Sequence, residues 1–173
     1  MYNAQMSVGQ SIALIGMAGV GKSTFGRKLA LKKDLLFIDT DDLLQEKIGT
    51  TLQRFLKAHG SKELLKKEEA IILSLKLTHQ TIIATGGSVV YSEEAMLHLK
   101  KIAKIAWLND TFENIKKRIP NSESRGLINP NQLPLDLLFE ERNPLYKRYA
   151  DTIINFPEET NKNSILKKLE ALL

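Results

Sequence analysis

The sequence predicts an α/β protein built on a parallel β-sheet. Short apolar runs alternate with longer stretches of helical composition, and the first apolar run stops at a glycine. Strands that alternate with helices form parallel sheets through right-handed crossover connections. The 173 residues, 43% hydrophobic and 26% charged, suit one soluble globular domain, so we predict a single domain over residues 1–173.

Five short apolar runs are expected to form the strands. Buried parallel strands are nearly continuous apolar segments of this length. The predicted strands are SIALIG (11–16), LLFI (35–38), QTIIAT (80–85), KIAWL (104–108) and DTIIN (151–155). Ligands of such sheets bind beyond the carboxyl ends of the strands, so these ends are the places to search for a site.

The segments between the strands have helical composition or apolar residues at helical spacing. The predicted helices are 22–33, 43–49 closed by Gly49, 61–78, 92–101 capped by Ser92, 111–119, 134–150 and 164–173. Pro144 should bend or break the helix that contains it. The segment PNSESRGLINPNQ (120–132) is polar and holds two prolines and a glycine, which predicts a loop.

The composition excludes several classes of function. The chain has no cysteine, so disulfides and thiolate metal sites are impossible, and its three histidines lack metal-ligand spacing. No apolar run approaches the ~20 residues of a membrane span, and the N-terminal MYNAQMSVGQ does not resemble a secretory signal. We therefore expect a cytoplasmic protein that has no membrane partner and is a monomer.

The net charge of +5 raises the possibility of nucleic-acid binding. The lysine pairs are spread along the chain with few aromatic residues between them, which favours solvated helix faces over a binding stripe. No nucleic-acid partner is therefore expected. Four of the six arginines lie in the C-terminal half, where their planar guanidinium groups suit phosphate or carboxylate. They are Arg118, Arg125, Arg142 and Arg148.

The segment GMAGVGKST (16–24) follows the first predicted strand and matches the Walker A phosphate loop, G-x-x-x-x-G-K-[ST]. Its glycines let backbone N–H groups turn inward around an anion, and the following helix adds its positive end. Lys22 should reach the β- and γ-phosphates, and the Ser23 hydroxyl should bind Mg²⁺. The expected nucleotide-binding residues are Gly16, Gly19, Gly21, Lys22, Ser23 and Thr24.

Two aspartates follow the second predicted strand in DTDD. Asp39 leaves the strand end beside the phosphate loop, where a carboxylate can hold Mg²⁺. Asp41 can face the acceptor and orient or deprotonate its hydroxyl. The alternative is helix capping by Thr40 or Asp41, worth about 1 kcal/mol and compatible with catalysis.

Taken together, these segments resemble the shikimate kinase family of P-loop kinases over nearly the whole chain. GMAGVGKST matches the family's phosphate loop and FIDTDDLL its F-x-D-x-D segment. TGG matches most of T-G-G-G, SRGLI most of the R-P-L-L lid motif, and ERNPLYKRYAD the R-x-x-x-Y-x-x-x-A-D pattern. The resemblance implies a three-layer P-loop kinase fold with a five-stranded parallel sheet, a lid at about 120–132 and a helical substrate-binding subdomain at about 41–70.

The resemblance also implies the reaction. The family transfers the γ-phosphoryl group of ATP to a ring hydroxyl of shikimate, so ATP, Mg²⁺ and a small-molecule acceptor are expected. Lys22, Asp41 and Arg125 would be catalytic, with Asp41 on the acceptor hydroxyls and Arg125 closing from the lid onto the phosphates. Arg142 would hold the acceptor carboxylate and Arg118 would lie against the adenine. Without the resemblance, Arg142 could equally be an exposed helix arginine.

The third predicted strand ends in Gly86 and Gly87, followed by Ser88, and these three residues are expected to bind the acceptor. Glycine lets a small molecule approach the backbone closely and leaves its N–H donors unobstructed. The family has a third glycine where this chain has Ser88, so the serine adds a hydroxymethyl group to the wall of the site.

A second departure lies in GSKELLKKE (60–68), where the family has G-E-x-x-F-R-x-x-E. Leu65 replaces the arginine that forms half of the clamp on shikimate's carboxylate. Lys66 is about 100° further around a helix and is a poor replacement. Losing one charged hydrogen-bond partner costs roughly 1.5–3 kcal/mol. Gly126 stands in place of the lid proline, which mainly loosens the loop.

Three functions therefore follow from the sequence. The first is a kinase for shikimate, and the second is a kinase for another polyol or sugar acid, motivated by Leu65 and Ser88. The third is a nucleotide-binding regulatory protein without turnover, which the intact Asp39, Asp41 and Arg125 disfavour.

Overall fold

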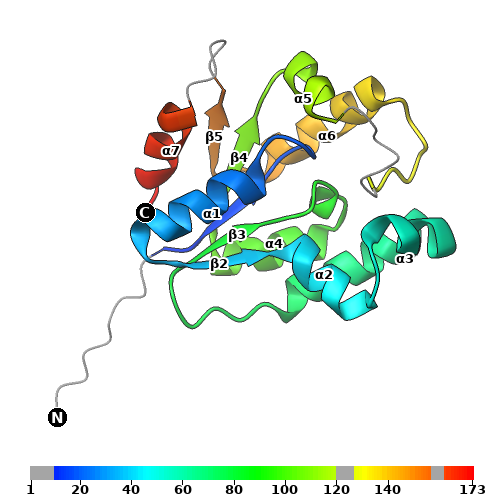
Figure 1. The fold of residues 1–173 in the computed structure, drawn as a ribbon, viewed down its shortest axis with the longest axis horizontal. Coiled ribbons are helices and arrows are strands. Elements are labelled where there is room, and N and C mark those ends of the chain that lie inside the picture. Colours follow the sequence, from blue (N-terminus) through cyan, green and yellow to red (C-terminus); the bar gives the residue numbers. More distant parts are fainter. Residues whose placement is uncertain (1–9, 120–126, 157–161) are drawn as a thin grey trace.

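In a computed structural model of the protein, five strands form one parallel sheet between two layers of helices (Figure 1). The structure describes residues 10–119, 127–156 and 162–173. The strand order is β2-β3-β1-β4-β5, and each neighbouring pair is parallel, which confirms the predicted sheet. The strands are β1 (Ile12–Ile15), β2 (Leu36–Asp39), β3 (Thr81–Ala84), β4 (Lys104–Asn109) and β5 (Thr152–Asn155).

The helices fall close to the predicted segments, and most begin at a residue that caps them. Ser92 accepts a hydrogen bond from the Ala95 N–H at the start of its helix, as predicted. Gly49 ends another helix in the left-handed conformation, also as predicted. The helices are α1 (Lys22–Lys33), α2 (Thr40–Ile48), α3 (Leu52–Ser74), α4 (Glu93–Ile102), α5 (Phe112–Arg118), α6 (Leu135–Tyr149) and α7 (Lys162–Glu170), with a 3₁₀ turn, η1 (Val89–Tyr91).

Alternate residues of the central strand β1 face the two helical layers. Ile12 and Leu14 pack in a core that includes side chains of α1, α5 and α7. Ala13 and Ile15 pack in a second core with side chains of α3, α4 and α6. All four side chains are fully buried. The uninterrupted apolar composition of the strand is therefore explained by burial on both faces.

Three local expectations are wrong. The predicted helix 61–78 begins earlier, at Leu52, and ends at Ser74, with non-helical backbone at Gly60. The cap of α2 is Asp39, whose carboxylate accepts from the Asp41 N–H, rather than Thr40 or Asp41. The predicted break at Pro144 is absent, because α6 continues through this residue and buries Leu138, Arg142, Tyr146 and Tyr149 along its length. Burial of these side chains offsets the backbone hydrogen bond that a helical proline loses.

Helices α2 and α3 pack together beside the sheet, at the lower right of Figure 1, whereas α5 and α6 lie at the upper right. A small core of Leu44, Leu64, Ile71 and Ile128 joins α2 and α3 to the segment that precedes α6. The carboxyl ends of β1, β2 and β3 point between these groups of helices, where the predicted site residues lie.

Candidate active site

The phosphate loop connects β1 to α1, as the motif requires. Gly16, Gly19 and Gly21 have φ values of 137°, 78° and 104°, in the left-handed region that favours glycine. A Cβ atom added to Gly16 would lie 2.5 Å from the Leu108 carbonyl oxygen, so the loop also packs too closely for a side chain. The turn that opens α1 is therefore fixed by glycine at the end of the central strand.

Lys22 is buried at the first position of α1. Its ammonium donates hydrogen bonds to the carbonyl oxygens of Gly16 (2.7 Å) and Met17 (3.0 Å) within the loop. Burial lowers the pKa of Lys22 to about 8, although the nearby carboxylate of Asp41 opposes the shift. Ser23 and Thr24 follow in the first turn and are exposed.

The β2–α2 junction brings two carboxylates to this edge of the sheet. The Asp39 carboxylate accepts from the Asp41 N–H at 3.1 Å, which fixes the backbone between them. Burial raises the pKa of Asp41 to about 6, while the charge of Lys22 opposes this shift. The residue between them, Thr40, is buried and accepts from the Gly86 N–H at 3.1 Å. This bond ties the end of β2 to the segment after β3.

The close approach at Gly86 involves the protein's own carboxylates. A Cβ atom at Gly86 would lie 2.0 Å from Glu68 Oε1 and 2.9 Å from Asp41 Oδ1. Because its N–H is bonded to Thr40, Gly86 does not supply the free donor that the sequence suggested. A Cβ atom at Gly87 would lie 3.1 Å from the Ala18 nitrogen and 3.3 Å from an Arg142 nitrogen, so this glycine separates the phosphate loop from α6.

Glu68 on α3 is the residue that sequence reasoning passed over. It is 3% exposed, and its Oε2 accepts from the Ser88 hydroxyl at 2.6 Å. Burial and the neighbouring Asp41 carboxylate raise its pKa to about 7, against the Ser88 hydrogen bond. The sequence did contain a signal for this residue, because the family motif G-E-x-x-F-R-x-x-E ends in a glutamate at this position.

Arg142 is fully buried in α6, so the alternative of an exposed helix arginine is wrong. Its guanidinium donates to the Ile128 carbonyl oxygen and, through Nε, to the Tyr91 hydroxyl at 3.2 Å. The guanidinium also lies over the Tyr91 ring, 5.0 Å from its centre. The Tyr91 hydroxyl in turn donates to Glu141. A buried cation thus faces the same space as Asp41 and Gly87.

Arg118 ends α5 beside the phosphate loop, where a Cβ atom on Gly19 would lie 3.6 Å from the Arg118 Cβ. Its guanidinium pairs with the buried carboxylate of Asp110 at 2.7 Å and lies 5.8 Å from the centre of the Phe156 ring. The Asp110 carboxylate also accepts from the Thr111 N–H at 2.8 Å. The arginine is therefore held at the rim of the loop, with one third of its side chain exposed.

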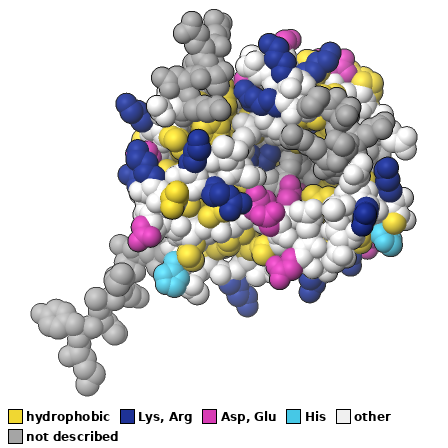
Figure 2. Space-filling view, viewed as in Figure 1, with side chains coloured by type: hydrophobic (Ala, Val, Ile, Leu, Met, Phe, Trp, Pro, Cys, Tyr) yellow, Lys and Arg dark blue, Asp and Glu magenta, His cyan; other side chains and the backbone are white. Residues whose placement is uncertain are grey.

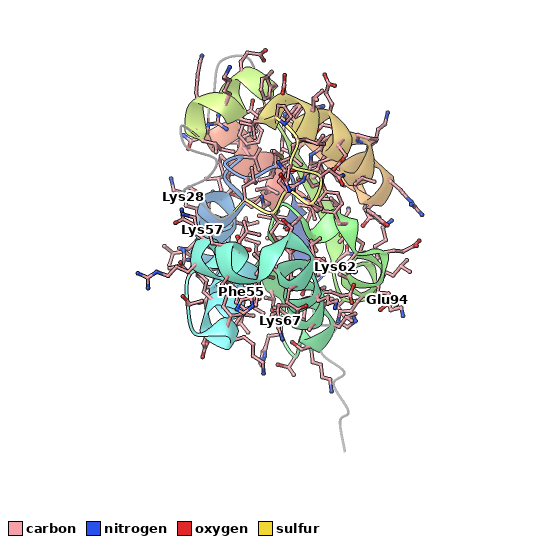
Figure 3. The ribbon with its side chains drawn as sticks, turned by 90° about the vertical axis from the view of Figure 1, so that its right-hand side faces the viewer. Lys28, Phe55, Lys57, Lys62, Lys67 and Glu94 are labelled. Carbon is pink, nitrogen blue, oxygen red and sulfur yellow. The ribbon has the colours of Figure 1, made fainter. Side chains whose placement is uncertain are left out.

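On α3, neither Leu65 nor Lys66 takes the place of the arginine that the family has at position 65. Leu65 is half-buried and packs against the small core that joins α2 and α3. Lys66 is exposed and pairs with Glu63 at 3.5 Å, so it does not take the place of an arginine at Leu65. Other lysines of α3 are exposed on the surface that Figure 3 views, and those labelled there are Lys57, Lys62 and Lys67.

A pocket joins the residues from these elements. It is lined by Ala18, Asp41, Leu44, Leu52, Gly86, Gly87, Ser88, Ile119, Leu127, Ile128 and Arg142. Arg125 and Gly126, which were predicted to lie in the lid, fall outside the described residues. A Walker A loop, a carboxylate pair after the neighbouring strand and a pocket at the carboxyl edge define a P-loop kinase.

The chain belongs to the shikimate kinase family. The family model described as "Shikimate kinase" matches residues 18–173. A shikimate kinase of Vibrio parahaemolyticus is 33% identical over 171 residues, covering 95% of this chain and 99% of that protein.

Solved structures agree with this assignment. A shikimate kinase from Acinetobacter baumannii, determined in complex with shikimate, has a TM-score of 0.83 at 25% identity and covers 94% of this chain and 92% of its own. The enzyme from Aquifex aeolicus has a TM-score of 0.79 at 26% identity, with 94% and 95% coverage.

Figure 2 shows how positive charge is distributed on one face of the molecule. On the face shown in Figure 2, lysine and arginine side chains are separated by other side chains instead of forming one continuous stripe. Among the described residues, no helix has both the length and the apolar composition that a membrane span requires.

Proposed function

We propose that this protein transfers the γ-phosphoryl group of ATP to a hydroxyl of shikimate, giving shikimate 3-phosphate and ADP. The observation that carries the proposal is that Asp41 and Arg142 line one pocket, with the buried Lys22 close enough to feel the charges of both, in a chain of the shikimate kinase family. Lys22 serves the phosphates, Asp41 the reacting hydroxyl and Arg142 the acceptor carboxylate. The complex of the Acinetobacter baumannii relative with shikimate supports this choice of acceptor.

The residues of the loop fit a nucleotide and its metal ion. The left-handed glycines Gly16, Gly19 and Gly21 turn the backbone around the position of the phosphates. Ser23 and Asp39 would hold Mg²⁺, which prefers hydroxyl and carboxylate oxygens. When bound, Mg²⁺ supplies positive charge that offsets the charge of the transferring phosphoryl group. Thr24, in the first turn of α1, is also expected to bind the nucleotide.

The adenine is expected beside Arg118, whose position is fixed by Asp110 and by the Phe156 ring. A guanidinium plane offers a flat surface on which an aromatic base can stack. Arg118 therefore lies against the adenine, which is the role that the resemblance implies for it. Arg125, on the segment 120–132 that we propose as a lid, would add a further charge at the phosphates.

Asp41 acts on the reacting hydroxyl of the acceptor. The hydroxyl oxygen forms a bond to the γ-phosphorus, the bond from that phosphorus to ADP breaks, and the hydroxyl proton passes to the Asp41 carboxylate. A pKa of about 6 leaves this carboxylate ionised at neutral pH and makes it a better proton acceptor than an ordinary aspartate. Gly86, Gly87 and Ser88 form the wall against which the acceptor ring lies.

A kinase for a different polyol or sugar acid is the second candidate, and Leu65 favours it. The side chain packs with the apolar core of α2 and α3, so it provides no partner for a carboxylate. An acceptor site with Arg142 as its buried arginine binds a carboxylate less strongly than one with two arginines, by about 10- to 150-fold.

The test measures the rate of ADP release with Mg-ATP, with and without shikimate over a wide concentration range. It compares the wild type with the variant Leu65→Arg. The proposal expects saturable shikimate-dependent turnover in the wild type and a lower KM in the variant. Turnover by the variant alone would favour the second candidate. A folded, ATP-binding protein that turns over no hydroxyl acceptor would instead be a regulatory protein.

We expect a monomer, which sedimentation would test, working in the cytoplasm. We expect the segment at about 41–70 to act as the substrate-binding subdomain of a single domain. We propose the nucleotide and the small-molecule acceptor as the partners of the protein.

A further inference from the structure

Ser88 and Glu68 form a buried pair at the wall of the acceptor pocket. The Ser88 hydroxyl donates to Glu68 Oε2 at 2.6 Å, and the two side chains come from different elements, the segment after β3 and helix α3. Ser88 lines the pocket and is 5% exposed, while Glu68 behind it is 3% exposed. A hydroxyl bonded to a buried carboxylate is held in one orientation.

This orientation decides what Ser88 can offer to a ligand. A serine hydroxyl has one proton to donate and two lone pairs that accept. Because the proton is directed to Glu68, the lone pairs of Ser88 Oγ are what it can present to the pocket. They can accept a hydrogen bond from a ligand hydroxyl, whereas a ligand carboxylate carries no proton to donate.

The charges around the pocket favour one orientation of the acceptor, in which its hydroxyls face Ser88. Glu68 Oε1 and Asp41 Oδ1 both lie close to Gly86, so this side of the pocket is rich in carboxylate oxygens. The buried guanidinium of Arg142 lies beside Gly87, on the phosphate-loop side. An anionic acceptor gains by turning its carboxylate to Arg142 and its hydroxyls to Asp41 and Ser88.

We propose that Ser88, oriented by Glu68, determines specificity by accepting a hydrogen bond from a non-reacting hydroxyl of the acceptor. Ser88 touches the acceptor, and Glu68 is a positioning residue that acts through it. This inference rests on the proposed function and deepens it, because it says which feature of the acceptor is recognised beyond the carboxylate and the reacting hydroxyl. The acceptor class is a ring acid with more than one hydroxyl.

The test compares kcat/KM for the wild type and Ser88→Ala on three acceptors: shikimate, and its two analogues that each lack one non-reacting hydroxyl. Ser88→Ala should lower kcat/KM for shikimate about 3- to 10-fold, mainly through KM, as loss of a single hydrogen bond does. With one of the two deoxy analogues the substitution should have no effect, because the contact is already absent. The other analogue keeps the contacted hydroxyl, so with it the substitution should lower kcat/KM as much as it does with shikimate.

The chain offers a matched control in a neighbouring serine–glutamate pair. Ser92 also donates to a glutamate of α3, Glu69, at 2.6 Å, but Ser92 caps α4 and neither residue lines the pocket. Ser92→Ala should lower stability without changing the discrimination between shikimate and the deoxy analogues. Ser88→Gly is the second Ser88 variant, which removes the hydroxyl without placing a methyl group against Glu68.

The outcomes separate the inference from the function on which it rests. Wild-type turnover of shikimate that neither Ser88 variant alters would overturn the inference alone. An equal loss with shikimate and both deoxy analogues would also overturn it, because the serine would then be structural. A wild type that does not phosphorylate shikimate would refute the proposed function itself, and the inference with it.

Discussion

Replacing Glu68 by glutamine should stabilise the protein at alkaline pH much more than at acidic pH. The wild-type carboxyl is buried against Asp41, and its pKa is raised from 4.5 to about 7. Since the folded-state pKa lies above the unfolded value, stability from this group is fully present below pH 4.5 and is lost as pH rises through 7. Glutamine cannot ionise, so the variant escapes this loss.

The magnitude follows from the size of the shift. Each pKa unit corresponds to 1.36 kcal/mol, so a rise from 4.5 to about 7 destabilises the ionised native state by about 3 kcal/mol. Between pH 5 and pH 8.5 the difference in unfolding free energy between Glu68→Gln and wild type should therefore change by about 2–3 kcal/mol, in favour of the variant.

Urea unfolding at several pH values measures this difference directly. The packing and hydrogen-bonding cost of the new amide is the same at each pH, so it cancels when the two pH values are compared. Glu69→Gln is the control for the substitution itself, since Glu69 also accepts from a serine but is half-exposed. A Glu68→Gln difference that is flat or falls with rising pH would refute the reasoning.

Three other substitutions test the remaining parts of the site. Lys22→Met should lower kcat by at least about 10²-fold, because a buried donor to the phosphates is lost, and a coupled ADP assay showing altered KM but intact kcat would contradict this role. Gly86→Ala should lower the unfolding free energy by about 1–3 kcal/mol, because its methyl group would lie 2.0 Å from Glu68 Oε1, and unchanged urea unfolding would count against that packing. Asp110→Asn should raise KM for ATP about 3- to 10-fold through Arg118 and leave KM for the acceptor unchanged, whereas an equal rise in both would point to general loosening.

The sheet and the nucleotide side of the site were predictable because their signals are local. The apolar runs of β1 and β3 reflect burial on both faces, and the Walker A loop is a contiguous segment whose glycines take positive φ. Gly49 and Ser92 were predicted as helix ends for similar reasons, since a cap depends on its immediate neighbours.

The acceptor side was less predictable because its contacts join distant segments. Glu68 lies 20 residues from Ser88, and nothing in the sequence alone pairs them. The requirement for Gly86 comes from Glu68 and Asp41, which approach it from two helices, and not from an open backbone donor. The complete burial of Arg142 likewise depends on Tyr91 and Ile128, which the pattern of α6 does not reveal.

The reaction that we assign to this site moves the γ-phosphoryl group of ATP to a ring hydroxyl of shikimate. Phosphorus NMR of a reaction with Mg-ATP, shikimate and the purified protein tests it most directly. We expect the loss of the γ-phosphate signal and the appearance of a phosphate monoester coupled to the proton on C3 of the ring. Release of inorganic phosphate alone, or unchanged ATP with folded protein, would contradict it.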